Sequence, residues 1–332
     1  YRSLSHITRC ESQENIDGHG SRPPVQAILL NKVRKNYNRF RRKVAYSKWK
    51  KHLETILKKE KEVDAIVLFS IPLNQLHDLP CFVHKCFDLP VVVYEADFVT
   101  YLWSDDDFLQ SSYYGVNLQE YDAFVVNSEG ILPKLKQLGA RNVEAIHFGA
   151  DPDIFSPLNV KQDIDVSFYG FGSLLRKTAI EYMISKPTRV LQDAKFAVMG
   201  CLNINVGLAK NMGNLTFGAL RSFCCRSKIN LNITRETFAK TYGTSTSRPF
   251  ELASLACCIV SNPCAGLEGW FNIGKEIYVV RDQNEAVETY KWLLSSDDLR
   301  REMGRRARQR VLKEHTYLHR ANQFLTLLNR VI

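Results

Sequence analysis

The 332-residue chain contains no apolar run that approaches the roughly 20 residues of a membrane-spanning helix, and its first residues include no signal-peptide apolar core. It also lacks G-x-S-x-G, H-E-x-x-H and P-loop lysine motifs, which excludes the hydrolase, zincin and P-loop NTPase classes that depend on them. The first strand-like segment ends in FSIPLNQ, without a nicotinamide-binding glycine fingerprint. We therefore expect a cytoplasmic protein that is neither a hydrolase of these classes nor a dehydrogenase.

Cysteine pairs with metal-binding spacing are also absent. None of the nine cysteines forms a C-x-x-C pair, so the sequence predicts no zinc site. Two pairs are adjacent, Cys224-Cys225 and Cys257-Cys258, and both lie in apolar segments typical of buried helix or strand. We expect these residues to be buried, reduced thiols.

The composition is that of an ordinary globular protein, with 45% hydrophobic and 24% charged residues. Its length exceeds what one hydrophobic core usually fills, so we expect two domains. Short apolar runs alternate with helical patterns, which is typical of doubly wound parallel sheets. The predicted strands fall into two sets, the first at 65–72, 91–97, 123–128 and 143–149, and the second at 165–170, 195–199, 229–233, 257–261 and 277–280. Helices are predicted at 130–138, ending at Gly139, and in three stretches from Asn284 onward.

Positive charge is concentrated between residues 32 and 62. This segment holds 13 Lys or Arg against 3 Glu, a net charge of +10 that equals the net charge of the whole chain. Its apolar residues recur near a 3.6-residue period, which predicts an amphipathic helix with a cationic face. Such a face can be merely solvated, or it can bind lipid headgroups or a nucleic-acid backbone. The candidate contact residues are Lys35, Arg39, Arg42, Lys43, Lys50 and Lys51.

The segment TSRPFELASLACCIVSNP, residues 246–263, predicts a helix that is followed by a buried strand. Arg248 and Glu251 are three residues apart and therefore share one face at the start of this helix. The helix N-terminus offers backbone N–H groups and a positive dipole end, and Thr246 and Ser247 add hydroxyls, so phosphate could bind here. The alternative is a helix cap with a surface ion pair.

Several spaced motifs within residues 63–332 resemble the GT-B glycosyltransferases, in particular the branch similar to spore-maturation CgeB proteins and, more distantly, the retaining family 4. The motifs are HFGADPDIFSPL at 147–158, DVSFYGFGSLLRK at 165–177, the SRPFE helix start at 247–251, GKEI at 274–277 and the terminal His315 to Arg320 segment. The resemblance implies two Rossmann-like doubly wound domains that face a cleft. We expect an acceptor-side domain at 1–150, a linker at 151–164, a donor domain at 165–315 and a C-terminal helix at 316–332 that crosses back to the first domain.

A GT-B chain normally opens with a strand and a glycine-bearing loop, whereas the first residues here, YRSLSHITRC, are typical of a helix. We therefore expect the first strand of the fold to be absent or replaced.

The resemblance also implies a metal-independent donor site in the second domain. Small residues after its first strand would let backbone amides approach a diphosphate, and fixed cations would stabilise charge on the departing nucleotide. An arginine at such a helix start can also lie simply along the protein surface. The expected donor-binding residues are Gly170, Gly172, Arg176, Asn232, Arg235, Thr246, Ser247, Arg248 and Glu251.

One departure from the family pattern and two candidate carboxylates concern the chemistry of the site. Glu251 matches the second glutamate of the family 4 E-x7-E motif, which holds the ribose hydroxyls, but Gly243 occupies the position of the first, so retaining stereochemistry does not follow. Glu95 and Asp97, at the end of the strand VVVYEAD, are candidates for the catalytic base that orients an acceptor hydroxyl, with a helix N-cap as the alternative for these acidic residues.

We therefore expect a glycosyltransferase that uses a UDP- or GDP-sugar and requires no cofactor or metal. Its acceptor could be a cell-envelope glycan, a lipid-linked molecule, a protein or modified DNA. The cationic segment would bring the chain to the inner face of a membrane or to nucleic acid. Two alternatives are a DNA-binding or DNA-glucosylating protein and a catalytically silent GT-B scaffold.

Overall fold

The computed structural model describes residues 46–60, 62–76, 78–96, 113–171, 174–200, 203–214 and 216–332. The chain divides into two compact units, Tyr1–Glu54 and Thr55–Ile332. Residues 46–59 are helical, and both predicted sheets lie in the second unit. Within the described residues, no helix is both long enough and apolar enough to cross a membrane.

The first sheet is parallel, with strand order β1-β2-β3-β4. Its two central strands, at 91–95 and 123–126, consist mainly of buried Val, Ala and Phe, as expected for a parallel sheet that is covered on its faces. The strands are β1 (Ile66–Phe69), β2 (Val91–Glu95), β3 (Ala123–Val126) and β4 (Val143–Ala145). The elements between them are η1 (Leu73–Gln75), α2 (Leu79–Phe87), η3 (Leu118–Glu120), η4 (Glu129–Ile131) and α4 (Leu132–Gln137). As predicted, Gly139 follows the last of these helices with a left-handed φ of 93°.

The second sheet is also parallel, with strand order β10-β9-β8-β5-β6-β7. Its strands are β5 (Ile164–Tyr169), β6 (Phe196–Met199), β7 (Lys210–Asn211), β8 (Ser227–Asn232), β9 (Ile259–Ser261) and β10 (Tyr278–Val279). The nine predicted strands are confirmed, most with shorter bounds. The sequence missed β7 because this two-residue edge strand is polar and exposed, and so gives no apolar signal.

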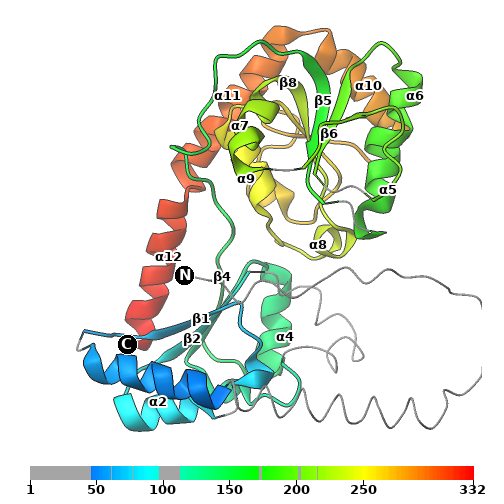
Figure 1. Ribbon diagram of the computed structural model, residues 1–332. Helices are drawn as coiled ribbons and strands as arrows, with labels where there is room; N and C mark the ends of the chain where they lie inside the picture. Colours follow the sequence, from blue (N-terminus) through cyan, green and yellow to red (C-terminus); the bar gives the residue numbers. More distant parts are fainter. Residues whose placement is uncertain are drawn as a thin grey trace, which may run out of the picture. The chain divides into compact units, whose positions relative to one another are not determined.

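Helices cover both faces of the second sheet (Figure 1). One hydrophobic cluster joins the sheet to α7 (Phe217–Cys225), α9 (Ser247–Ser254) and α11 (Asp297–Glu314). The other joins it to α5 (Lys177–Ile180), η6 (Glu181–Ser185) and α10 (Gln283–Leu294). The remaining short helices are η5 (Leu174–Arg176), α6 (Pro187–Val190), α8 (Glu236–Lys240) and η7 (Leu267–Gly269). This two-sided cover confirms the predicted doubly wound architecture.

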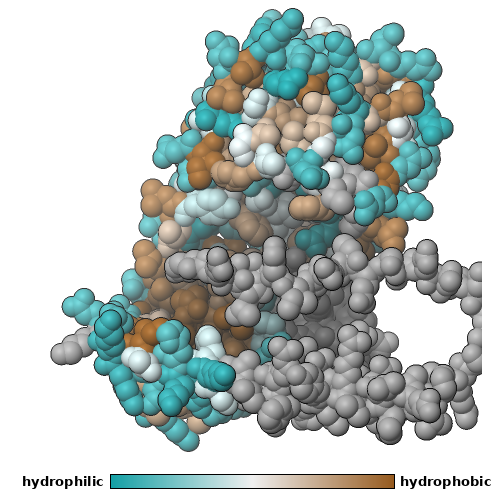
Figure 2. Space-filling model, viewed as in Figure 1, coloured by the Kyte–Doolittle hydropathy of each residue, from teal (hydrophilic) through white to brown (hydrophobic). Residues whose placement is uncertain are grey.

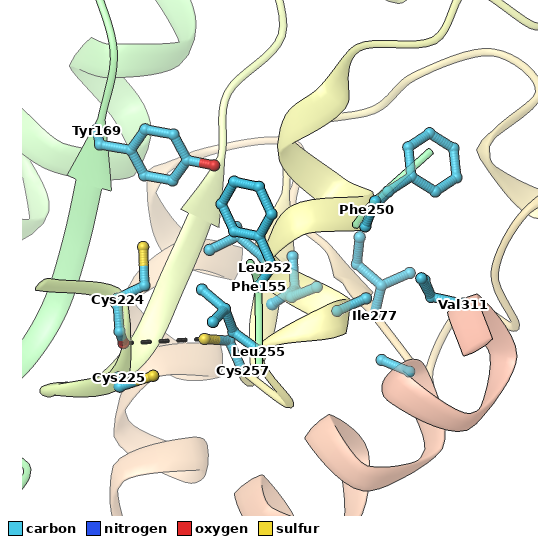
Figure 3. Packing of buried hydrophobic residues seen from close by; sticks show 14 of the residues in the cluster. Phe155, Tyr169, Cys224, Cys225, Phe250, Leu252, Leu255, Cys257, Ile277 and Val311 are labelled. Atoms are coloured by element: carbon cyan, nitrogen blue, oxygen red, sulfur yellow. Dashed lines mark hydrogen bonds between the residues drawn. The ribbon is translucent and has the colours of Figure 1, made fainter. Parts of the chain in front are cut away.

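Of the adjacent cysteines, Cys224, Cys225 and Cys257 contribute to the first of these clusters (Figure 3), and Cys258 contributes to the second. All described cysteines are free thiols, and Cys224, Cys225, Cys257 and Cys258 are buried, which confirms the sequence prediction. Burial raises the pKa of each of these four thiols, so they are protonated at neutral pH.

The last helix, α12 (Tyr317–Val331), packs on the first sheet rather than on the second. Leu327 lies in one buried cluster with Val92 and Ile146, and the ring of Phe324 meets Tyr94 edge-on at 5.4 Å. A capping box between Thr316 and His319 starts the helix. The domain boundaries stay a prediction.

Some sequence predictions lie outside the described residues. They concern Lys35, Arg39, Arg42, Lys43, Asp97, Gly172 and the start of the chain. Lys50 and Lys51 are on the helix at 46–59.

Candidate active site

The helix predicted around Arg248 and Glu251 is α9, which begins after Thr246 without a side-chain cap hydrogen bond. Phe250, Leu252 and Ala253 are fully buried and seat the helix in the core of the second sheet. Arg248 is only 8% exposed, and Glu251 is half-buried. Because the guanidinium of Arg248 is inside the protein, Arg248 is not part of a surface ion pair, which was the alternative interpretation.

Arg248 is held at the carboxyl ends of two neighbouring strands. Its Nη1 donates to the carbonyl oxygen of Ile233 at 3.0 Å, and its guanidinium carbon lies 5.1 Å from the ring centre of Phe168 and 5.0 Å from that of Tyr169. Within the described structure the buried Nε has no hydrogen-bond partner. Gly170 makes this position possible, since a Cβ there would lie 2.8 Å from Nη2 of Arg248 and the backbone has a φ of 148°.

Arg176 approaches the same carbonyl group. Its Nε donates to the oxygen of Ile233 at 3.1 Å, and its Nη1 donates to the oxygen of Phe171 at 3.0 Å. Two guanidinium groups on one carbonyl oxygen repel each other, and a bound anion would offset that repulsion. The structure thus brings together two of the predicted phosphate ligands, Arg176 and Arg248, at the end of β8.

Glu251 has a partner that the sequence did not indicate. The hydroxyl of Tyr169, the last residue of β5, donates to Oε2 of Glu251 at 2.7 Å. Tyr169 is 6% exposed, and Figure 3 shows its ring on the side of the strand that faces the α9 side chains. Burial first and then the charge of Glu251 raise the pKa of Tyr169 well above its usual range. Tyr169 is therefore a permanent hydrogen-bond donor that orients the carboxylate through Oε2.

The other predicted donor residues fall into two groups. Thr246 and Ser247 are half-buried at the first turn of α9, and Arg235 precedes α8 with its guanidinium 4.5 Å from the ring centre of Phe238. Asn232, in contrast, is 1% exposed and its Nδ2 donates to the Ser261 hydroxyl at 2.8 Å. Its amide thus connects β8 to β9 inside the sheet.

The loop before α9 is tied to the end of β3 in the first sheet. The hydroxyls of Ser128 and Thr244 are 2.7 Å apart, and their backbones form an antiparallel bridge. Asn127 donates to the carbonyl of Ser245 at 3.1 Å and accepts from its backbone N–H at 2.9 Å. The hydroxyl of Ser245 also accepts from the Phe148 N–H at 2.9 Å. Since these hydroxyls are engaged, only Thr246 and Ser247 of this loop remain as hydroxyl donors to a phosphate.

On the first sheet, Glu95 ends β2 and is half-buried. Burial, followed by the charge of Glu95, raises the pKa of Tyr113 well above its usual range, so Tyr113 stays protonated beside this carboxylate. His147 follows β4, and its Nε2 lies 3.1 Å from Oε1 of Glu129. Burial lowers the pKa of His147. Its ring is neutral at pH 7.

Metal-ligating groups are not clustered in the described part of the chain. No set of three or more His, Cys, Asp or Glu side chains there is arranged to hold a metal ion.

The comparisons with known proteins agree with this architecture. Residues 177–326 match a family model described as glycosyl transferase-like. A search of curated protein sequences gives no match. Among solved structures, the chain is similar to sucrose-phosphate synthase from Thermosynechococcus elongatus, with a TM-score of 0.64 and 13% identity over 87% of this chain and 78% of that one.

Two further structures have the same fold. A glycosyltransferase from Rickettsia africae gives a TM-score of 0.61 and 13% identity, covering 85% of this chain and 80% of that one. HepE from Anabaena, solved in complex with UDP, gives a TM-score of 0.63 and 10% identity, covering 83% of this chain and 81% of that one. The chain therefore has the two-sheet GT-B fold of these structures, and its residues 177–326 are similar to the glycosyl transferase-like family.

Proposed function

We propose that the chain transfers a sugar from a nucleotide diphosphate sugar to an acceptor hydroxyl, and that the donor binds at the start of α9. The observation that carries this proposal is the placement of Arg176 and Arg248 on the carbonyl of Ile233, next to the carboxylate of Glu251. Two fixed cations suit a diphosphate, and a carboxylate that Tyr169 holds through one oxygen suits a pair of ribose hydroxyls.

Each residue of the donor site would have a distinct role. Arg176 and Arg248 would neutralise the charge that develops on the nucleotide diphosphate as the glycosidic bond breaks. Backbone N–H groups at the start of α9, together with Thr246 and Ser247, would donate to phosphate oxygens. Arg235, Gly170 and Gly172 are proposed to complete the diphosphate site, and closure around the donor would exclude water.

The acceptor would enter from the first sheet. Glu95 and Asp97 are the candidates for the base that takes the proton of the acceptor hydroxyl as its oxygen attacks the anomeric carbon. Tyr113 supports the placement of Glu95, since the two groups interact and Tyr113 cannot lose its own proton near neutral pH.

HepE has been solved with UDP and with UDP-glucose, so UDP-glucose is the first donor to test for this chain, followed by GDP-sugars. We expect donor binding to need no metal, because guanidinium groups supply the positive charge. Addition of EDTA should therefore leave the affinity for UDP unchanged, and a loss of binding in EDTA would contradict the metal-free site.

The test is a thermal-shift screen against UDP, GDP, ADP, CDP and dTDP and their glucose conjugates. A ligand at about 100 times its Kd adds roughly 2.7 kcal/mol to the free energy of unfolding, which gives a clear shift. We expect one nucleotide to shift the wild type and the control Glu268→Gln, whose side chain is exposed on η7, but not Glu251→Gln. No shift with any nucleotide would contradict the proposal, and binding without sugar transfer or donor hydrolysis would favour a silent scaffold.

A further inference from the structure

A cavity of about 430 Å³ lies at the carboxyl ends of the strands of the first sheet and against α12. We refer to it as the first-sheet cavity. It is separate from the residues assigned to the donor, and its volume falls in the range of small-molecule sites. Its lining comes from the ends of all four strands of the first sheet and from one face of the last helix, among them Phe69, Tyr94, Asn127, Ile146, Ala321 and Phe324.

The walls of the first-sheet cavity are mainly apolar and aromatic. Phe69 stacks on Tyr94 with ring centres 5.1 Å apart, and Phe324 of α12 meets Tyr94 edge-on. Phe69 is nevertheless 60% exposed and Val67 is 38% exposed. Figure 2 shows hydrophobic residues gathered along α12 and the neighbouring part of the first sheet. Large apolar side chains left open around a cavity favour a ligand with an apolar body.

Two buried polar atoms of the residues that line this cavity have no hydrogen-bond partner in the described structure, Oδ1 of Asn127 and Nδ1 of His147. Asn127 is 3% exposed, and its Nδ2 donates to the carbonyl of Ser245. Because only the amide nitrogen can donate to a carbonyl, this bond fixes the orientation of the side chain. Oδ1 then has no hydrogen-bond partner in the described structure. A buried acceptor without a partner is unfavourable, and a ligand hydroxyl would satisfy it.

Arg320, the charged side chain that lines the cavity, does not require an anionic ligand. Arg320 donates through Nε to the carbonyl of Phe148 at 3.1 Å and through Nη2 to Nδ1 of His315 at 2.7 Å. Its Nη1 donates to the carbonyl of Glu314 at 3.3 Å. Since the guanidinium is already engaged by uncharged acceptors, the unpartnered atoms of the lining are the neutral groups Oδ1 of Asn127 and Nδ1 of His147, and they favour an uncharged polar group on the ligand.

We infer that the first-sheet cavity binds a molecule with an apolar body and a hydroxyl group that donates to Oδ1 of Asn127. If the proposed function holds, this molecule is the sugar acceptor, and its role as acceptor rests on that function. The location supports this assignment, because Asn127 is bonded to Ser245, two residues before the helix that carries Arg248 and Glu251. The mainly apolar walls favour such a molecule over a fully hydroxylated glycan.

The probe is 4-butylphenol, with 4-butylanisole as a matched compound that has no hydroxyl to donate. Binding to the full chain is measured by isothermal titration or ligand-observed NMR. We expect the phenol to bind with a Kd of about 1 mM or tighter and the anisole to bind at least fivefold more weakly. Equal affinity for the two compounds, or no binding of the phenol, would overturn the inference.

The location is tested with Ala321→Trp, which adds a large side chain to the cavity from an exposed position on α12. The control is Asn322→Trp, the next residue, which is also exposed and does not line the cavity. We expect Ala321→Trp to weaken phenol binding at least tenfold while Asn322→Trp leaves it unchanged. Unchanged binding by Ala321→Trp would place the phenol elsewhere and contradict the site.

UDP binding is measured on the same proteins. A failure of the proposed donor site can then be distinguished from a failure of the proposed ligand site in the first-sheet cavity. If the chain binds the phenol, Ala321→Trp abolishes this binding and the chain does not bind UDP, then the cavity is a ligand site but not the acceptor site. UDP binding in a chain that does not bind the phenol would reject the cavity alone.

Discussion

At the scale of single residues, the proposed donor site depends on a buried arginine and a glycine that makes room for it. Arg248 lies in the first turn of α9, and its guanidinium is nearly enclosed between Gly170, Phe168 and Tyr169. Rigid packing of a cation against aromatic rings holds its position before any ligand binds, which reduces the entropy lost on binding.

The bond from Tyr169 to Glu251 gives the first prediction. Tyr169→Phe removes only the hydroxyl, so the carboxylate loses the donor that orients it. We expect the Kd for UDP to rise about 3- to 10-fold, with about 1 kcal/mol lost from the free energy of unfolding. Isothermal titration and urea unfolding measure the two quantities.

The matched control for this prediction is Tyr290→Phe. Tyr290 is also fully buried, and its hydroxyl donates to the carbonyl of Met183 at 2.9 Å, on the opposite face of the second sheet. Tyr290→Phe should lower the free energy of unfolding about as much as Tyr169→Phe does, without changing the affinity for UDP. The role of Tyr169 would be rejected if both variants bound UDP as the wild type does.

His315 gives a prediction about pH. Burial, with a smaller effect from Arg320, lowers the pKa of His315 to about 4, whereas the unfolded chain has a value near 6.5. Between these pH values the unfolded chain binds a proton that the native chain does not, so stability is complete above pH 6.5 and falls as the pH drops toward 4. We expect the free energy of unfolding, measured with urea, to fall by about 1 to 2 kcal/mol between pH 7 and pH 5.

The variant His315→Asn should reduce this pH dependence, whatever its stability at pH 7. His52→Asn serves as the control, because His52 is exposed on the helix at 46–59. If the free energy of unfolding falls equally in wild type and His315→Asn between pH 7 and pH 5, a group other than His315 causes the pH dependence.

At the scale of elements, the packing of α11 on the end of α9 determines how closely the helices approach. A Cβ at Gly304 of α11 would lie 2.0 Å from the carbonyl oxygen of Ala256, a backbone atom that cannot move aside. Gly304→Ala should therefore destabilise the chain by about 2 kcal/mol in spite of the better helix propensity of alanine. Gly218→Ala in α7 has open space around it and should stabilise by up to about 1 kcal/mol. Equal thermal midpoints for the two variants would contradict this packing.

Most strands and the three last helices could be predicted because each has a local signal of apolar residues between turn residues. β7 has no such signal, since Lys210 and Asn211 are exposed. In the site, the motif predicted Arg176, Arg248 and Glu251. Tyr169 and Asn127 could not be found in this way, because their partners are 82 and 118 residues away and no local pattern records such a pairing.

At the scale of the whole molecule, the net charge of +10 equals that of residues 32–62 alone, so the rest of the chain is neutral overall. If this segment docks on anionic lipid, binding to phosphatidylglycerol vesicles should weaken as salt rises from 50 to 200 mM. The double variant Lys50→Glu and Lys51→Glu should weaken binding at least tenfold, and Lys134→Glu with Lys136→Glu on α4 should have little effect. Salt-sensitive binding to duplex DNA without vesicle binding would favour the nucleic-acid alternative.

The central claim is that a nucleotide diphosphate binds at the start of α9. The most direct test is isothermal titration of the full chain with UDP, beside Glu251→Gln and the surface control Glu268→Gln. The account predicts one UDP per chain, an affinity at least tenfold weaker for Glu251→Gln, and no change for Glu268→Gln. If Glu251→Gln and wild type bind UDP equally, or if neither binds it while another nucleotide binds both equally, the donor does not bind at Glu251.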